Sequence, residues 1–441
     1  MNSKKLIRNL MAGALSLLVL AGCGNKDNAT TSPSTEGSGS ESSSTEVSQD
    51  SDIVTKLDGE TKIVFWHAMG GGQGEALEKL VKEFEEENPN IKVDLQNQGN
   101  YGDLSQKLTA TMQSSDDLPT ITQAYGDWMV PFLEGDLVVD LKPYIENEEI
   151  GFDNYDDIIE GLREETNQDG MITSLPFNKS TEVLWYNKTL FDELGLEVPT
   201  TFEELKEVSQ KIYEEKKIPG VGFDALSNYY ATYLKDKGVD MDSKLDVTSD
   251  ESKEAINYYL DGIKEGYFRI AGTDQYMSGP FANEQVGAYI GSNAGEVYIK
   301  DGVDGKFDYE AAPYPAGQSV QQGTNIYMFA NATAEEKTAA YEFLKFLTSK
   351  DAQIEFGLDT GYMPIRQTAI EDEKYISSDS KIAKVLSDAT KNLFSRKVEP
   401  GSQQAYNDTS SFLESVLSNK DADVDSEVET VSYTHLRAHE T

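Results

Sequence analysis

The run Lys62-Ile63-Val64-Phe65-Trp66 and the segment after it decide the fold class of this chain. The run is apolar enough for a buried strand, and the loop Gly70-Gly71-Gly72-Gln73-Gly74 leads from it into residues 75–87. Five apolar residues of that segment fall on one helical face: Ala76, Leu77, Leu80, Val81 and Phe84. A strand that feeds an amphipathic helix through a short loop predicts an α/β fold.

The same alternation continues along the chain. Ile91, Val93 and Leu95 alternate with polar residues as a second strand, and Pro119-Thr120-Ile121-Thr122 opens a third. A second α/β unit starts with the strand Val183-Leu184-Trp185-Tyr186. Two capping-box patterns open later helices: Thr201-x-x-Glu204 and Thr333-x-x-Glu336. We therefore predict sheets that are mostly parallel and covered by helices on both faces.

Several polar and aromatic residues follow the predicted strands directly. In open α/β sheets, ligands bind beyond the carboxyl ends of the strands. This rule places Trp66, His67, Tyr101 and the turn Gly126-Asp127-Trp128 near one mouth of the fold. We expect a small molecule to bind there.

An export signal precedes the folded part. Residues 1–22 join a positively charged start to an apolar run that ends in Ala21-Gly22, as a secretory signal does. Cys23 is the only cysteine, and Leu20-Ala21-Gly22-Cys23 resembles the bacterial lipobox, which implies acylation of Cys23 and cleavage before it. Residues 23–58 are rich in Ser, Thr and Gly and predict a disordered tether. We expect a protein held at the outer face of the cell membrane by its lipid alone.

Composition excludes several classes of function. With 38 basic and 78 acidic residues, a net charge of −40 makes nucleic acid an unlikely partner, because phosphate binding needs clustered cations. The loop 70–74 lacks the Lys-Ser/Thr of a phosphate loop, and three histidines with one cysteine do not make a zinc site. We predict neither a metal nor a cofactor. Residues 432–439 are basic after a long acidic chain, and we interpret residues 432–441 as a non-native tail.

Three motifs carry a resemblance to a known family. Leu175-Pro176-Phe177-Asn178-Lys179-Ser180-Thr181, Leu184-Trp185-Tyr186-Asn187-Lys188 and Thr360-Gly361-Tyr362-Met363-Pro364-Ile365 resemble the extracellular solute-binding proteins of ABC sugar importers, and most strongly the glycerol-3-phosphate-binding proteins. The resemblance implies a type II periplasmic-binding-protein fold with two lobes, a hinge and a ligand cleft. The resemblance implies that lobe 1 consists of residues 59–175 and about 322–363. It implies that lobe 2 consists of residues 176–321 and about 364–431.

The resemblance also implies ligand contacts, which fall on matching residue types here: Tyr101, Ser180, Ser292, Gly323 and Tyr362. Two positions depart from the family pattern. Gly126, next to Asp127, stands where a glutamate is expected, and Tyr406 stands where an arginine should hold a phosphate. Because the arginine fork is missing, we predict a neutral mono- or oligosaccharide as the ligand. Lys179 is the nearest cation that could substitute, so glycerol-3-phosphate or a glycerophosphodiester stays the alternative.

The 23 tyrosines offer further contacts, because an aromatic face can cover a pyranose ring while its polar edge hydrogen-bonds the rim. We place Tyr229, Tyr230, Tyr289 and Tyr406 in loops and expect Tyr229, Tyr289 and Tyr406 to contact the ligand. The strand residue Trp185 is better explained by packing.

These observations favour a binding protein over an enzyme. We predict a monomeric substrate-binding component that captures a carbohydrate outside the cell and delivers it to the permease subunits of an ABC importer. A lipid-anchored glycoside hydrolase with paired carboxylates and a surface adhesin are the alternatives from other classes. The chain has no G-x-S-x-G nucleophile motif, and 78 acidic residues always supply some carboxylate pair.

Replacing Cys23 tests the anchoring. Cys23→Ala removes the acylated thiol, so the protein should leave the membrane fraction or stay unprocessed. Intact-mass analysis of the native protein should show a lipid-modified N-terminal Cys23. An unmodified Cys23, or a mature chain that starts elsewhere, would contradict the assignment.

Overall fold

The computed structural model describes residues 53–242, 245–399 and 402–430. The predicted signal, Cys23, most of the tether and the tail 432–441 lie outside the described residues. Among the described helices, none combines the length and the apolar character that crossing a membrane requires.

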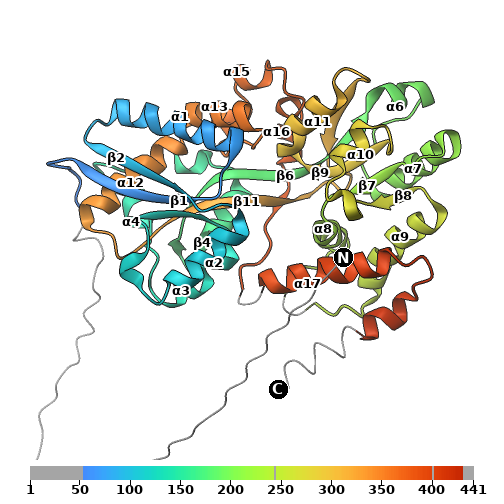
Figure 1. The fold of residues 1–441 in the computed structure, drawn as a ribbon, viewed down its shortest axis with the longest axis horizontal. Coiled ribbons are helices and arrows are strands. Elements are labelled where there is room, and N and C mark those ends of the chain that lie inside the picture. The colour runs from blue at the N-terminus through green and yellow to red at the C-terminus, as the bar shows by residue number, and fades with distance from the viewer. Residues whose placement is uncertain (1–52, 243–244, 400–401, 431–441) are drawn as a thin grey trace, which may run out of the picture. The chain divides into compact units, whose positions relative to one another are not determined.

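One main sheet organises the chain, in the strand order β2-β1-β3-β11-β6-β9-β7-β8 (Figure 1). Two parallel groups form its ends, and two long strands run antiparallel between them. We call the part built on β1 to β3 the first lobe and the part built on β7 to β9 the second lobe. The main strands are β1 (Thr61–His67), β2 (Ile91–Asn97), β3 (Ile121–Ala124), β6 (Leu175–Asn187), β7 (Val221–Phe223), β8 (Phe268–Ile270), β9 (Ala288–Ser292) and β11 (Ser319–Met328).

Short strands complete the β structure. β10 pairs with β6, β12 pairs with β11, and β4 and β5 form a small separate pair. Their bounds are β4 (Asn167–Gln168), β5 (Met171–Ile172), β10 (Tyr309–Pro313) and β12 (Leu393–Phe394). Because β6 and β11 cross antiparallel between the groups, the prediction of mostly parallel sheets holds only for the two ends.

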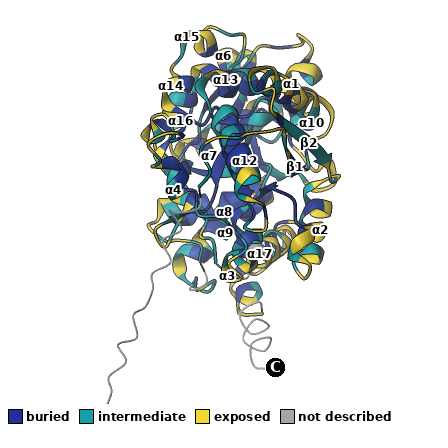
Figure 2. Cartoon of the chain, turned by 90° about the vertical axis from the view of Figure 1, so that its left-hand side faces the viewer, coloured by how far each residue is buried: buried dark blue, intermediate teal, exposed yellow. Residues whose placement is uncertain are grey.

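Helices cover the sheet on both faces, and their outward sides are exposed (Figure 2). Those of the first half are α1 (Gly71–Glu87), α2 (Tyr101–Thr111), α3 (Val130–Glu134), α4 (Lys142–Ile145), α5 (Glu160–Thr166), α6 (Lys188–Leu194), α7 (Phe202–Lys216) and α8 (Leu226–Asp236). Those of the second half are α9 (Asp250–Glu265), α10 (Ser278–Ala282), α11 (Glu296–Val303), α12 (Ala334–Leu347), α13 (Lys350–Thr360), α14 (Gln367–Ile370), α15 (Glu373–Ile376), α16 (Leu386–Ala389) and α17 (Ser402–Leu417).

The predicted apolar face of the first helix is confirmed, because all five of its residues are buried. Gly70 of the predicted loop is the N-cap of α1, and the glycines after it belong to the first turn of the helix, which begins at Gly71 with a φ of 52°. A residue without a side chain reaches this left-handed conformation easily, so the helix can start inside the loop. The strand predicted at Val183 starts earlier, at Leu175, and is buried almost throughout.

Two placements correct expectations about segments. The predicted tether reached Asp58, but Ile53 and Leu57 pack against the core and Oγ1 of Thr55 donates to Glu149 at 2.8 Å. The predicted tyrosine loops are regular elements, because Tyr229 and Tyr230 lie in α8, Tyr289 in β9 and Tyr406 in α17. Tyrosine occurs in helices and strands as well as in loops, so these residues alone did not predict the element.

The lobe boundaries stay a prediction. The chain after Pro364 contacts the first lobe, where Ile159 N–H donates to Ile365 O at 3.0 Å and Arg366 pairs with Asp157 at 3.3 Å. Further along, Lys381 N–H donates to Glu296 of the second lobe. This segment therefore belongs to both lobes by its contacts.

Gly323 tests how tightly the crossing strands pack. It lies in β11 with a φ of 89°, and a Cβ there would stand 2.1 Å from the carbonyl oxygen of Asn178. Gly323→Ala should lower the free energy of unfolding by about 2 to 4 kcal/mol, from backbone strain and overpacking together. Gly317→Ala is the matched control, because Gly317 also has a positive φ of 65° but no neighbour within 4 Å. Equal losses in urea unfolding of both variants would contradict the packing argument.

Candidate ligand-binding site

A row of polar side chains lies along one face of β6. Asn178, Ser180 and Glu182 alternate along the strand and therefore point to the same face. Gln322 of β11 stands opposite Ser180, and Ser292 at the end of β9 stands opposite Glu182. Directly opposed residues of antiparallel strands share a face, so these five side chains form one polar floor.

Part of this floor is free to bind. Three hydrogen bonds engage the Asn178 amide, which donates to the hydroxyl of Tyr101 at 3.1 Å and accepts from Gln123 and Thr324. Ser292 Oγ accepts from Ala294 N–H at 3.2 Å and so caps the turn after β9. Among the described residues, no hydrogen bond occupies the Ser180 hydroxyl, which makes it available to a ligand.

Three aromatic rings of the first lobe stand beside the floor. Tyr101 contacts Tyr125 and Trp128 with ring centroids 5.4 and 6.1 Å apart, and Tyr125 contacts Trp128 at 5.1 Å, all edge to face. Tyr101 begins α2 directly after Asn100, which forms a capping box with Asp103. Burial raises the pKa of Tyr101 and of Tyr125, so both hydroxyls stay neutral donors at physiological pH.

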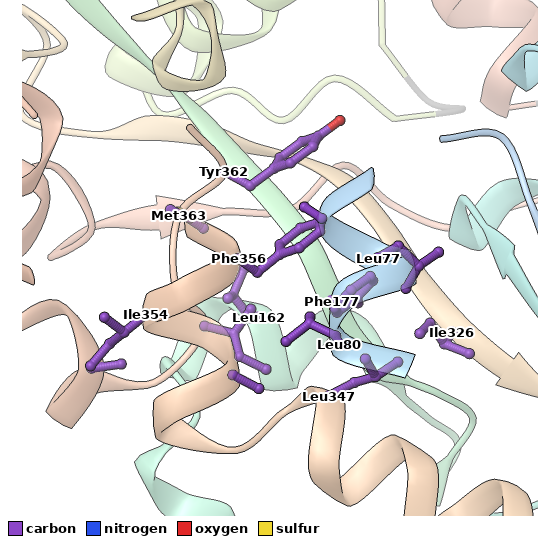
Figure 3. Close-up of a cluster of buried hydrophobic side chains, with 14 of the residues drawn as sticks. Leu77, Leu80, Leu162, Phe177, Ile326, Leu347, Ile354, Phe356, Tyr362 and Met363 are labelled. Carbon is purple, nitrogen blue, oxygen red and sulfur yellow. The ribbon is translucent and has the colours of Figure 1, made fainter. Parts of the chain in front are cut away.

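Tyr362 extends a stack of rings that begins in the core. Phe177 of β6 stacks on Phe356 at 4.7 Å, and Phe356 stacks on Tyr362 at 5.9 Å with an interplanar angle of 5°. Figure 3 shows Phe356 between the other two rings and the hydroxyl of Tyr362 pointing away from the cluster. Tyr101 lies close enough to Tyr362 for the second hydroxyl to raise its pKa. The rigid stack therefore holds an aromatic face next to the Tyr101 wall.

Gly126 lies in a 3-10 turn, η3 (Gly126–Met129), and has a specific packing role. A Cβ at this position would stand 2.9 Å from Cγ2 of Val398. The space that a glutamate would need is thus filled by the chain between β12 and α17. Sequence analysis could not find this contact, because nothing in the local pattern links residues so far apart.

Asp127 presents an unused acceptor beside Gly126. Its Oδ1 is buried and has no hydrogen-bond partner among the described residues. Burial raises the pKa of Asp127, and the nearby guanidinium of Arg396 opposes that rise. A buried acceptor without a partner is costly, so a ligand hydroxyl that donated to it would remove that cost.

Arg396 corrects the expectation that this side of the site has no arginine. Its guanidinium lies 3.9 Å from the centroid of the Tyr406 ring. Within the described ranges, Arg396 forms no hydrogen bond or ion pair. Tyr406 stands where an arginine was expected, and the guanidinium of Arg396 stacks on its ring. The sequence had not indicated Arg396 as a site residue.

Lys179 cannot be the substitute cation, and that prediction is wrong. Its side chain is fully buried and pairs with Glu165 of α5 at 2.7 Å, while Nζ also donates to Gly323 O at 3.1 Å and to Asn325 Oδ1 at 3.3 Å. Burial lowers the pKa of Lys179. Alternation along β6 explains the placement, because Lys179 points to the face opposite Ser180.

A groove lies next to Arg396, and none of the five residues of the polar floor lines it. It has a volume of about 1040 Å³, and Arg396 and Val398 line it together with Glu165 of α5 and Lys235 of α8. Arg396 contacts Tyr406, and Val398 packs on Gly126. The groove therefore meets the site only at Arg396 and Val398, and Glu165 places it towards the Lys179 face of β6.

Four predicted contacts lie apart from this group. Trp66 donates from Nε1 to Gln96 at 3.0 Å, and His67 accepts at Nδ1 from Met69 N–H at 3.2 Å, so their polar atoms are used internally. Burial lowers the pKa of His67, which keeps it neutral.

The other two lie in packed cores. Tyr229 donates to Ala255 O at 2.6 Å, and Tyr289 packs on Phe281 with ring centroids 5.4 Å apart. Both are at most 1% exposed, so we leave Tyr229 and Tyr289 out of the proposed site.

The structure brings the remaining predicted contacts together, and it adds residues that were missed. Ser180, Ser292, Gly323, Tyr101 and Tyr362 gather around β6 and β11, with Asp127 and Tyr406 beside them. Asn178 and Glu182 could have been found from sequence, since residues two positions from Ser180 share its face of a strand. Arg396 and Val398 carry no such signal.

Two known binding proteins are similar to this chain in sequence. UgpB of Rhizobium meliloti, an sn-glycerol-3-phosphate-binding periplasmic protein, is 26% identical over 340 residues, which cover 71% of this chain and 77% of that one. The UgpB of Brucella melitensis is 24% identical over 341 residues, with the same coverage.

Solved structures confirm the periplasmic-binding-protein fold. UgpB from Mycobacterium tuberculosis, in complex with glycerophosphocholine, has a TM-score of 0.73 at 22% identity and covers 85% of this chain and 98% of that one. The GacH receptor of Streptomyces glaucescens, solved unliganded and with acarbose, has a TM-score of 0.72 at 20% identity and covers 87% and 98%. The family model described as bacterial extracellular solute-binding protein matches residues 79–384, and the chain belongs to that family.

Proposed function

We propose that this protein is the substrate-binding component of an ABC importer and captures a carbohydrate outside the cell. The observation that carries the proposal is the polar floor of β6 and β11 beside the rings of Tyr101 and Tyr362. Neutral hydroxyl and amide groups next to aromatic faces suit a sugar, which has both polar edges and apolar faces.

The contacts that we propose come from both lobes. Tyr101, Tyr362 and Asp127 would contact the ligand from the first lobe. From the crossing strands, the contacts would come from Ser180 and the backbone at Gly323. The others would come from Ser292 at the end of β9 and from Tyr406 with Arg396. Gly126 would contribute space and backbone only. A ligand that touches both sides stabilises the closed form by its differential affinity for it.

Delivery and anchoring belong to the same proposal. The loaded protein would dock as a monomer on the permease subunits, held to the outer face of the membrane by lipid on Cys23. The family description supports an extracellular location. No catalytic step is proposed, because the family and the named relatives are binding proteins.

A phosphorylated polyol, such as glycerol-3-phosphate or a glycerophosphodiester, is the second candidate. The observation that favours it is the guanidinium of Arg396, which lacks an ion-pair partner in the described part of the chain. The names of the UgpB relatives support the same class. Against it, Asp127 stands close enough to Arg396 to interact with its charge, so a phosphate would meet a carboxylate as well.

A thermal-shift panel separates the two candidates. Maltose, longer neutral oligosaccharides, glycerol-3-phosphate and glycerophosphocholine are tested on the full chain and on Arg396→Gln. We expect a neutral saccharide to raise the melting temperature and the phosphates to leave it unchanged. If only the phosphates raise it, and Arg396→Gln abolishes that rise while Lys82→Gln on the exposed surface of α1 does not, the sugar proposal fails.

The aromatic wall gives a second test with whichever compound binds. Tyr101→Ala or Tyr362→Ala should weaken binding about ten- to a hundredfold, because each removes apolar cover at roughly 25 cal/mol per Å² and a ring contact. Tyr298→Ala is the control, since Tyr298 is 65% exposed on α11. Calorimetry that finds unchanged affinity for both wall variants would place the site elsewhere.

A further inference from the structure

A chain of hydrogen bonds leads from the middle of β6 to α17. Asn228 of α8 donates from Nδ2 to Oε1 of Glu182 at 2.9 Å, and its Oδ1 accepts from the hydroxyl of Tyr406. The ring of Tyr406 in turn carries the guanidinium of Arg396. The two bonds fix the Asn228 amide in one orientation, because its donor and its acceptor are both committed.

Glu182 is an unusual member of this chain. It is 2% exposed, and its Oε2 has no hydrogen-bond partner among the described residues. No ion pair found within the described ranges includes Glu182. A buried carboxylate without a cation is strongly disfavoured, so the neutral acid is the form that fits here.

The titratable groups that face Glu182 either raise its pKa or are neutral. Burial raises the pKa of Glu182 to about 8, the carboxyl of Asp224 adds to that rise, and the bond from Asn228 opposes it. The remaining titratable neighbours are the hydroxyls of Tyr314, after β10, and Tyr406, in α17. None of these groups is a cation that could stabilise a buried carboxylate.

We propose that Glu182 is a positioning residue of the ligand site, which through Asn228 holds Tyr406 and α17 in place beside Arg396. The proposal deepens the function proposed above and rests on it only for the identity of the site. Glu182 does not itself touch the ligand in this scheme. Its role is to fix the ring on which Arg396 stacks.

The proposal has a definite pH dependence. If α17 moves away and Glu182 becomes hydrated, its carboxyl titrates near the ordinary value of 4.5 instead of about 8. The packed arrangement is therefore fully favoured below pH 4.5, weakens as the pH rises towards 8, and changes no further above 8.

Hydrogen exchange of α17 in the full chain, without any ligand, tests this dependence between pH 6 and pH 9. After correction for the intrinsic exchange rate, protection of residues 402–417 should fall by up to about tenfold per pH unit and level off near pH 8. Glu182→Gln keeps the acceptor for Asn228 but cannot ionise, so its protection should not change with pH. Tyr406→Phe should be poorly protected at every pH.

Asp224→Asn is the matched control. The pKa of Asp224 is also raised, to about 7, but its carboxylate accepts from Met277 N–H and has no bond to Asn228. Asp224→Asn should keep the fall of protection with pH, but the fall should level off at a somewhat lower pH because the Asp224 carboxyl no longer raises the pKa of Glu182. If the dependence survives in Glu182→Gln or disappears in Asp224→Asn, the proposal is overturned.

A direct titration keeps the test decisive if a variant fails to fold. The carboxyl carbon of Glu182 in the wild-type protein, followed by NMR, should titrate with a midpoint near 8, and a midpoint near 4.5 would overturn the proposal. Because no ligand is added, both results stand whichever compound binds in the thermal-shift panel. A wrong importer function would leave the α17 measurement unchanged, so the two failures are distinguishable.

Discussion

The burial of β6 on both of its faces is the constraint on which the site depends. A strand inside the protein must find a partner for every polar side chain it carries. Lys179 has Glu165, and Thr181 donates to Ser319 Oγ at 2.7 Å, so the face that points away from the ligand is satisfied by the protein itself. On the opposite face, the Ser180 hydroxyl and Oε2 of Glu182 have no hydrogen-bond partner among the described residues. In the part of the chain that the structure describes, only the face of β6 that carries Ser180 therefore has polar atoms available to a ligand.

Rigid supports hold the groups around that face. Tyr362 rests on a stack that reaches Phe177 of the same strand, and Tyr101 accepts a hydrogen bond from Asn178. Both rings are thus held by β6, through the adjacent residues Phe177 and Asn178. Groups that are already ordered lose little side-chain entropy when a ligand binds. Tyr101 and Tyr362 are therefore held by the core before a ligand binds, and no loop has to fold around the ligand to bring them into place.

The parts of this structure that sequence predicted are local. The buried face of α1 and the capping box of Thr333 with Glu336 depend on residues one helical turn apart, and both are present. The box predicted at Thr201 is half present, because Glu204 N–H reaches Thr201 but the Glu204 carboxylate binds Thr200 instead. Contacts such as Val398 on Gly126 depend on the complete path of the chain. No periodicity or spacing encodes them, so the arginine on Tyr406 was missed with them.

The balance of charge inside the site differs from that of the whole chain. A net charge of −40 is screened beyond roughly 8 Å at physiological salt, so a ligand in the site meets mainly the groups next to it. With Glu182 neutral, those groups are the guanidinium of Arg396 and the carboxyl of Asp127, one of each sign. Such a pair offers a donor and an acceptor without a strong net field, which suits hydroxyl groups better than a phosphate. Ionising Glu182 would add a second negative group behind Tyr406 and favour an anion even less, so in this site the protonation of one buried acid bears on both the packing of α17 and the choice of ligand.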